Sequence, residues 1–400
     1  MKPIVPGGWY HFLYTLMARI YYRRIRAIGR EHLPSGGPVL YAMLHRNGAI
    51  DGMIHHVVFP RGTFLISTQL NRSLFGRLFF TGIPVARETD EGDRRDNTAS
   101  LERCVEQLTA GGELAIFPEG TSDLGPRHLP FKPGIAVILS RALSAGAPVT
   151  VIPVGLFYQQ PERFRSDVTV VVGAPVDTSL APALDKQERV EILMQRITQA
   201  LEALGVNVET GEDLTRIERL AALASDGDEK RYYSTLKNLE RNPLPAPIHD
   251  EWQNVEQAID RDEIATAYGA PVFSKRGALW SLAWLMIQAP LTGAAMIANL
   301  PPLAAGWWAG RRFADARNTI ALWRMLIGFP VLCLWFLIVV GIALALGRPL
   351  VLAGYVILSA AGLILFPELV ERWARLRNQL RAQAVRPAFE SVRSWLQTHA

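Results

Sequence analysis

Two residues early in the chain, His45 and Asp51, have side chains that could carry out acid–base chemistry. Both lie in the segment His45-Arg-Asn-Gly-Ala-Ile-Asp51, which directly follows a short apolar run. A neutral imidazole can take a proton from a hydroxyl, and a neighbouring carboxylate fixes its tautomer and stabilises the imidazolium. His55 and His56 are alternative bases, since Asp51 and His55 are one helical turn apart. We favour His45, which follows a strand and could therefore face a cleft.

Two basic residues further along could attract a phosphate. Arg87 ends the segment Gly82-Ile-Pro-Val-Ala-Arg87 and offers planar, permanently charged donors. Lys132 lies in Phe131-Lys-Pro-Gly134, just before a Pro-Gly helix start. Each could also be an ordinary solvated cation.

The segment Phe117-Pro-Glu-Gly-Thr-Ser122 combines several groups suited to ligand binding. Gly120 allows the backbone to approach a ligand closely, and Thr121 and Ser122 supply hydroxyl groups. Glu119 could accept a hydrogen bond from a substrate hydroxyl or organise a nearby arginine.

The elements that must position these groups alternate along the first half of the chain. Short apolar runs predict strands at Pro38–Leu44, Thr63–Thr68, Ile83–Ala86, Leu114–Phe117, Val149–Leu156 and Val168–Val172. Helical spacing predicts helices at Asn97–Ala110, Gly134–Ala145 and Lys186–Leu204. This alternation predicts an α/β fold with a mostly parallel sheet flanked by helices. The polar segments follow strands, where such sheets bind ligands.

The order and spacing of these segments resemble the glycerolipid acyltransferase superfamily, which includes lysophosphatidic acid and glycerol-3-phosphate acyltransferases. That family has a His–Asp block, a Gly…Arg block, Phe-Pro-Glu-Gly, and an apolar strand with a central proline, here Pro153. The resemblance covers roughly Pro38 to Val176. Five residues rather than four separate His45 from Asp51, a spacing similar to that of the fungal-type glycerol-3-phosphate acyltransferases. We expect Gly48 to accommodate the extra residue.

The resemblance implies transfer of a fatty acyl group from acyl-CoA or acyl-carrier protein to a glycerophosphate hydroxyl, without a cofactor or a metal. His45 would be the general base and Asp51 its orienting carboxylate. Arg87, Glu119, Gly120, Thr121, Ser122 and Lys132 would bind the acceptor. We expect 1-acylglycerol-3-phosphate as the acceptor, giving phosphatidic acid. Glycerol-3-phosphate is the alternative acceptor, and a non-catalytic membrane lipid-binding protein is the alternative from another class.

Composition excludes several other classes of protein. The net charge of +5, from 42 basic and 37 acidic residues, is too small for a protein that coats nucleic acid, so no nucleic-acid partner is expected. Two cysteines cannot build a disulfide framework. The mean hydropathy of +0.13 is high for a soluble enzyme and indicates contact with lipid.

Residues 277–367 are expected to form membrane helices. Stretches 325–347 and 350–367 contain no charged residue and predict two spans joined by a tight turn. The uncharged stretch 277–310 contains internal prolines and has basic residues on both sides. We expect it to form a broken or re-entrant hairpin with both ends in the cytoplasm, and a single span is the alternative.

The remaining segments complete the predicted organisation. Aromatic and basic residues in 1–30 predict a helix lying at the membrane interface, with a helix packed on its own domain as the alternative. Residues 31–206 are predicted to form the acyltransferase domain, 207–270 a helical linker region, and 368–400 a basic C-terminal helix. The protein is expected to be integral to a membrane, with the acyltransferase domain on the cytoplasmic side.

Overall fold

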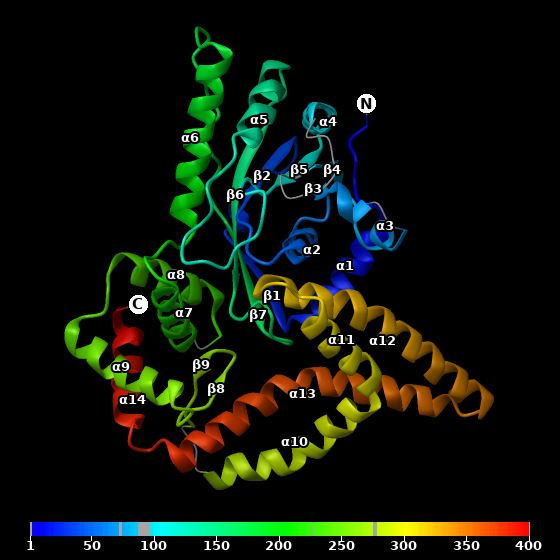
Figure 1. The fold of residues 1–400 in the computed structure, drawn as a ribbon, viewed down its shortest axis with the longest axis vertical. Coiled ribbons are helices and arrows are strands. Elements are labelled where there is room, and N and C mark those ends of the chain that lie inside the picture. Colours follow the sequence, from blue (N-terminus) through cyan, green and yellow to red (C-terminus); the bar gives the residue numbers. More distant parts are fainter. Residues whose placement is uncertain (1, 72–73, 87–96, 226, 275–277, 400) are drawn as a thin grey trace. The chain divides into compact units, whose positions relative to one another are not determined.

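The computed structural model describes residues 2–71, 74–86, 97–225, 227–274 and 278–399 (Figure 1). The chain divides into two compact units. The first comprises Met1–Arg19, Ile25–Phe157 and Val168–Glu209, and the second comprises Ile20–Arg24, Tyr158–Asp167 and Thr210–Ala400. The predicted acyltransferase domain, residues 31–206, therefore contributes one short segment, Tyr158–Asp167, to the second unit.

A seven-stranded sheet forms the centre of the first unit. Its strands are β1 (Arg24–Ile28), β2 (Val39–Met43), β3 (Gly62–Ser67), β4 (Ile83–Val85), β5 (Glu113–Ile116), β6 (Thr150–Tyr158) and β7 (Asp167–Val172). They follow the order β1-β7-β6-β2-β5-β3-β4, and the pairs β6–β2, β2–β5, β5–β3 and β3–β4 are parallel. Each predicted strand is present, and the predicted mostly parallel sheet flanked by helices is confirmed.

Helices cover both faces of this sheet because its buried strands present apolar side chains on both sides. Leu40 of β2 belongs to a buried cluster with residues of α4 (Thr98–Thr109), α5 (Gly134–Ser144) and α6 (Lys186–Leu204). The next residue, Tyr41, contacts the rings of His55 and Phe59 at the end of α2 (Ala49–Val58). Shorter helical segments are η1 (Arg30–His32), η2 (Thr68–Asn71) and α3 (Leu74–Phe79).

The N-terminal segment differs from the helix predicted over residues 1–30. Helix α1 occupies only Gly8–Tyr21, and Arg24–Ile28 forms the edge strand β1. Its sequence, Arg-Ile-Arg-Ala-Ile, alternates polar and apolar residues only over its first four positions, and this short strand pattern was obscured by the many arginines around it. In α1, Tyr14 and Met17 are buried in the first unit, whereas Trp9 and Phe12 are exposed. One face of α1 therefore packs on its own domain, and its interfacial role stays a prediction.

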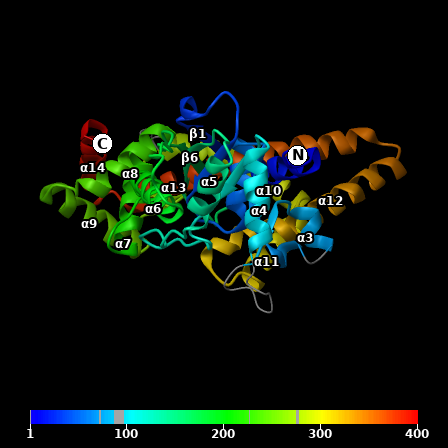
Figure 2. The same cartoon turned by 90° about the horizontal axis from the view of Figure 1, so that it is seen from above.

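Four apolar helices lie within the second unit: α10 (Ala278–Ala298), α11 (Leu300–Arg312), α12 (Ile320–Ala345) and α13 (Pro349–Arg381). By length and composition, 278–298, 317–345 and 349–381 can each cross a membrane. Helices α12 and α13 are joined by a tight turn, as predicted (Figure 2). The 277–310 stretch breaks at Asn299, as expected. Since α10 alone reaches spanning length and α11 has only 13 residues, these lengths favour the single-span alternative.

Small residues let the apolar helices approach one another closely. Helix α11 packs on α12, where a Cβ added at Gly328 would lie 3.3 Å from the Cα of Gly306. Helix α10 packs on α13, where a Cβ at Gly362 would lie 2.4 Å from the Cβ of Ala295. Such contacts between small residues are typical of helix pairs in membranes.

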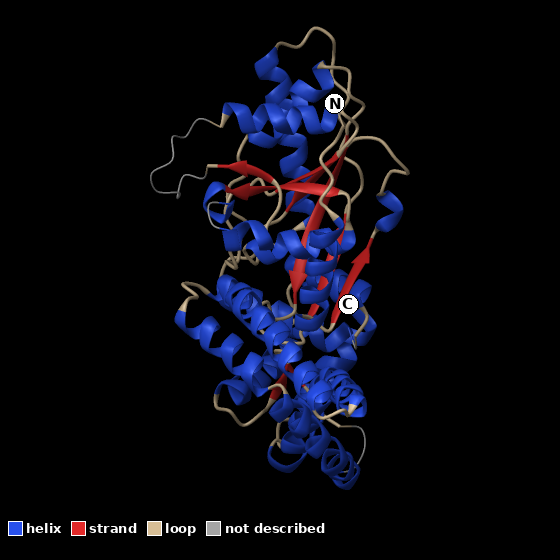
Figure 3. Cartoon of the chain, turned by 90° about the vertical axis from the view of Figure 1, so that its right-hand side faces the viewer, coloured by secondary structure: helices blue, strands red, loops and turns tan. Residues whose placement is uncertain are grey.

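The rest of the second unit is largely helical (Figure 3). It contains α7 (Gly211–Ser225), α8 (Glu229–Arg241), α9 (Ala246–Asp260), α14 (Arg386–His399) and a short pair of strands, β8 (Thr266–Ala267) and β9 (Ala270–Pro271). The region predicted as a linker is thus helical and also packed: Trp252 of α9 is fully buried, and α9 packs against α14. The predicted basic C-terminal segment supplies the end of α13 and all of α14.

Candidate active site

The candidate catalytic residues follow two neighbouring strands. His45 comes shortly after β2, and Glu119 comes shortly after β5. Because β2 and β5 are paired in parallel, their carboxyl ends meet at one edge of the sheet. The fold therefore brings together two residues that are 74 positions apart in the sequence.

His45 and Asp51 form a direct pair. Nδ1 of His45 lies 2.9 Å from Oδ2 of Asp51, and both side chains are almost completely buried. The same carboxylate oxygen accepts hydrogen bonds from the backbone N–H groups of Arg46 (2.6 Å) and Asn47 (2.8 Å). A carboxylate at Nδ1 favours the tautomer with the proton on that nitrogen. The lone pair of the other ring nitrogen, Nε2, is then able to accept a proton.

The backbone at Gly48 makes this pair possible despite the longer spacing. Gly48 has φ +53° and ψ −146°, a conformation open essentially only to glycine, and α2 begins at the next residue. Asp51 lies in the first turn of α2, and its N–H donates to the carbonyl of Gly48 over 3.2 Å. The contact between Asp51 and His45 is therefore retained with five intervening residues.

Glu119 accepts hydrogen bonds from the backbone of two separate segments of the site. Its Oε1 accepts from the N–H of His45 over 2.7 Å, and its Oε2 accepts from the N–H of Leu129 over 3.1 Å. The residue is 2% exposed. Burial raises the pKa of this carboxyl above its usual value, and the two backbone hydrogen bonds oppose the rise. The structure thus gives Glu119 a positioning role that the sequence did not indicate, and its contact with substrate stays a prediction.

The loop after Glu119 lies close to Lys132. Gly120 has φ +74°, and a Cβ there would lie 3.1 Å from the Nζ of Lys132. The backbone N–H of Lys132 donates to the carbonyl of Pro118 over 2.8 Å. Thr121 is exposed and Ser122 is half-buried, on the loop that returns to His45 through a backbone hydrogen bond from Asp123. Arg87 lies outside the described residues.

The sequence reasoning missed two contributors to the site. The ring of Phe117 stacks on His45, with centroids 4.4 Å apart and planes 26° from parallel. Phe117 belongs to the Phe-Pro-Glu-Gly segment, so it could have been predicted from the sequence as part of the site. The backbone donors at Arg46 and Asn47 carried no such signal, because their role depends on the turn and not on side-chain type.

His55 and His56, the alternative bases, are buried elsewhere on α2. His55 contacts Tyr41 and Phe59, and His56 contacts the rings of His11 and Tyr14. Burial lowers the pKa of His55 to about 3 and that of His56 to about 4. These surroundings are those of core residues, and they favour His45 as the base.

A His–Asp pair and a glycine-containing loop lie at the carboxyl edge of a mostly parallel sheet, an arrangement that can take a proton from a hydroxyl. Residues 24–156 match the family model described as Acyltransferase. The resemblance found in the sequence is thereby confirmed for this part of the chain, which is an acyltransferase domain.

Several relatives are similar to the same part of the chain. Glycerol-3-phosphate O-acyltransferase 2 of Saccharomyces cerevisiae is 31% identical over 162 residues, which are 39% of this chain and 20% of that protein. A 1-acyl-sn-glycerol-3-phosphate acyltransferase of Chlamydomonas reinhardtii is 24% identical over 197 residues, 48% of this chain and 57% of that protein. The chain thus spans less than two thirds of either relative.

Among solved structures, the chain is similar to the 1-acyl-sn-glycerophosphate acyltransferase PlsC from Thermotoga maritima. The match has a TM-score of 0.35 and 16% identity, and it covers 50% of this chain and 80% of the other.

Proposed function

We propose that this protein transfers a fatty acyl group from an acyl thioester to the free hydroxyl of 1-acylglycerol-3-phosphate, forming phosphatidic acid. The observation that carries the proposal is the 2.9 Å contact between His45 and Asp51 at the end of β2. A buried, oriented imidazole of this kind suits a general base for a hydroxyl nucleophile. The match of residues 24–156 to the Acyltransferase family model supports the reaction class.

In the proposed reaction, Nε2 of His45 removes the proton from the acceptor hydroxyl as its oxygen attacks the thioester carbonyl. Asp51 stabilises the imidazolium that forms. The tetrahedral intermediate then collapses, the C–S bond breaks, and the imidazolium returns its proton to the leaving thiolate. The products are an ester and a thiol, and His45 is again neutral. No Ser or Cys nucleophile is required, because the thioester is already activated.

The acceptor phosphate would be held by cationic and backbone groups beside His45. Lys132, which lies over the Gly120 turn, is a candidate supported by the structure. Arg87, Glu119, Thr121 and Ser122 are proposed from the sequence to complete the acceptor site. The acyl donor is proposed to be acyl-CoA or acyl-carrier protein.

Glycerol-3-phosphate is a second candidate acceptor. It is favoured by the similarity to the yeast glycerol-3-phosphate O-acyltransferase and by the five-residue spacing between His45 and Asp51. The proposal also includes an integral membrane protein whose acyltransferase domain faces the cytoplasm, supported by the apolar helices and by the basic residues that flank them.

The test is an acceptor assay with the purified full-length protein in lipid nanodiscs. Labelled acyl-CoA or acyl-carrier protein is supplied with 1-acylglycerol-3-phosphate or with glycerol-3-phosphate, and lipid products are separated. We expect labelled phosphatidic acid from 1-acylglycerol-3-phosphate. Exclusive formation of 1-acylglycerol-3-phosphate from glycerol-3-phosphate would select the second candidate. Lipid binding without any acyl transfer would indicate a non-catalytic protein.

Substitution of the base tests the chemistry itself. His45→Ala is expected to lower kcat by roughly 10²- to 10⁴-fold, the usual contribution of a general base. His249→Ala, in α9, is the matched control and should keep the wild-type rate. Near-normal kcat for His45→Ala would refute the assignment of the base.

A further inference from the structure

A polar cavity lies within the second unit, and it is lined by other residues than those of the candidate active site. Its volume is about 380 Å³, and it is lined by residues of α7, β9 and the segment after it, the start of α10, the C-terminal part of α13 and α14. Three arginines line it, namely Arg372 and Arg375 of α13 and Arg393 of α14. Among the described residues that line the cavity, none is acidic. The charged side chains that line the cavity are therefore all cationic.

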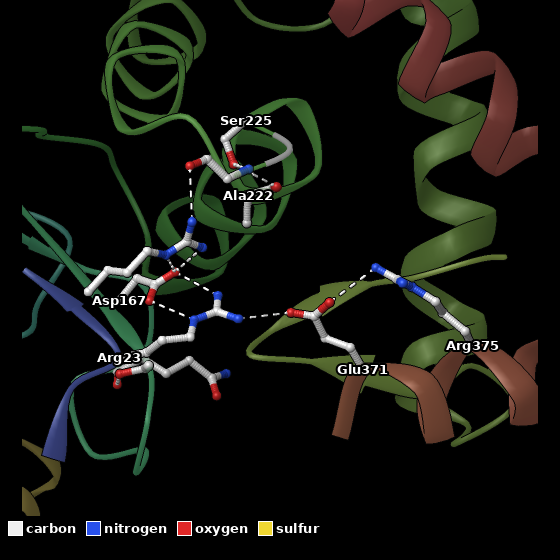
Figure 4. A network of polar contacts seen from close by, with 10 residues as sticks. Arg23, Asp167, Ala222, Ser225, Glu371 and Arg375 are labelled. Atoms are coloured by element: carbon white, nitrogen blue, oxygen red, sulfur yellow. Dashed lines mark hydrogen bonds and ion pairs between the residues drawn. The ribbon is translucent and has the colours of Figure 1, made fainter. Parts of the chain in front are cut away.

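The orientation of these arginines is fixed by neighbouring groups. Glu371 accepts from Arg375 over 3.1 Å and also pairs with Arg23, so that it lies between the two guanidinium groups (Figure 4). Arg372 lies 5.4 Å over the ring of Trp284 and 3.6 Å from Glu368. Within the described part of the chain, the buried Nε of Arg372 has no hydrogen-bond partner.

Contacts within the walls of the cavity hold the segments that form it together. The rings of Phe273 and Phe389 are 4.5 Å apart. The buried side chain of Asn378 bonds the backbone of Ala265 and Val272, which fixes the β8–β9 segment on α13. A preformed site of this kind lowers the entropy cost of binding.

The cavity lies where two candidate membrane spans reach their polar ends. Trp280 and Ser281, at the start of α10, line it together with Arg372, which follows the apolar part of α13. Helix α10 exposes Leu279 before this point and Leu282 and Met286 after it. Tryptophan and arginine at the end of an apolar helix are typical of the headgroup layer.

We propose that this cavity binds the phosphate-bearing headgroup of an anionic membrane lipid, whose acyl chains lie along the exposed apolar face of α10. Guanidinium groups bind phosphate oxygens through paired, charge-assisted hydrogen bonds. The volume falls in the range of small-ligand sites and suits a glycerophosphate headgroup. The site is independent of acyl transfer, since it shares no residue with the His45 region.

The experiment measures lipid retention by the full-length protein in detergent, using native mass spectrometry. The probes are phosphatidylglycerol, phosphatidic acid and phosphatidylcholine at equal concentrations, and inorganic phosphate as a competitor. We expect both anionic lipids to be retained in preference to phosphatidylcholine. The double variant Arg372→Gln/Arg393→Gln should weaken retention of phosphatidylglycerol by at least about 10-fold. Arg381→Gln, an exposed arginine on α13 outside the cavity, is the matched control and should retain the lipid as the wild type does.

Two further variants make the test specific to the cavity. Ala222→Phe is designed to fill the cavity while leaving the arginines in place. If the double variant fails to fold, lipid retention by Ala222→Phe is measured instead. His45→Ala should lose acyl transfer and keep wild-type retention of phosphatidylglycerol, so the two proposals can fail independently. Unchanged retention in the folded double variant or in Ala222→Phe would overturn the lipid site. So would equal retention of phosphatidylcholine. Binding of inorganic phosphate without retention of anionic lipid would overturn it in favour of a soluble ligand.

Discussion

Nδ1 of His45 and Oδ2 of Asp51 lie 2.9 Å apart, although one residue follows a strand and the other lies in the first turn of the next helix. The turn between them has its positive φ at Gly48. Three donors converge on one oxygen of Asp51, two of them from the backbone of this turn. The orientation of the imidazole therefore depends on the backbone path as much as on the two side chains.

Replacing Gly48 by alanine should damage the site without removing any functional group. The backbone at this position lies in a region where a Cβ costs about 1–3 kcal/mol, so the turn would shift and move Asp51 relative to His45. We expect a lower melting temperature and a kcat reduced by more than the change in KM. Gly134→Ala is the control: a Cβ there meets nothing within 4 Å, and φ is not positive. Equal activity of both variants would show that the turn does not position the pair.

Glu119→Gln tests the positioning role of the buried carboxylate. Glutamine has one carbonyl oxygen, so either His45 or Leu129 would lose the acceptor for its backbone N–H. A buried donor left without a partner costs about 1–3 kcal/mol. We expect a lower melting temperature together with a lower kcat, because the backbone of His45 is released.

Glu113→Gln serves as the control for Glu119→Gln. Glu113 is also buried and is the first residue of β5, the strand that Glu119 follows. It bonds Tyr41 and Arg61 at the opposite end of this strand from Glu119. This variant should lose stability and keep kcat. If Glu119→Gln likewise lost only stability, Glu119 would have no part in positioning the base.

The sequence predicted the elements that depend on local patterns. Short apolar runs identified the strands from β2 to β7, and residue types identified His45, Asp51 and the loop after β5. Edge strand β1 escaped detection because its arginines hide a short alternation. The backbone bonds of Glu119 and the assignment of residues 158–167 to the second unit could not be predicted, since both depend on contacts between distant parts of the sequence.

The two buried histidines of α2 should make stability depend on pH. Within the described part of the chain, neither ring nitrogen of His55 or His56 has a hydrogen-bond partner, and burial lowers their pKa values to about 3 and about 4. In the unfolded chain a histidine has a pKa of about 6.5. The unfolded state therefore takes up protons that the folded state rejects as the pH falls below about 6.5, and stability falls toward pH 4.

His55→Phe isolates this effect. Phenylalanine suits a pocket formed by Tyr41 and Phe59, and it cannot be protonated. Between pH 7.5 and pH 5, the unfolding free energy of the wild type should decrease. In the variant this decrease should be smaller by about 2 kcal/mol. The measurement is thermal or denaturant unfolding at both pH values. Phe64→Leu, in β3 on the same face of the sheet, is a control that should change stability equally at both. An identical pH dependence in wild type and His55→Phe would show that His55 is not buried as a neutral group.

An arginine placed on α13 should reveal which part of this helix meets lipid. Ile357 and Leu380 are almost equally exposed, at 69% and 68%, but Ile357 lies in the apolar part of the helix and Leu380 near its charged end. An arginine in the middle of a membrane helix costs about 2.5–3.5 kcal/mol on insertion scales, whereas an arginine in water costs little. Ile357→Arg should therefore reduce the fraction of protein that stays in membranes after alkaline extraction. Leu380→Arg should leave that fraction at the wild-type value. If the two variants stayed in membranes to the same extent, the apolar part of α13 would not lie in the bilayer. The two positions are equally exposed on one helix, so only contact with hydrocarbon at Ile357 would make its arginine variant behave differently.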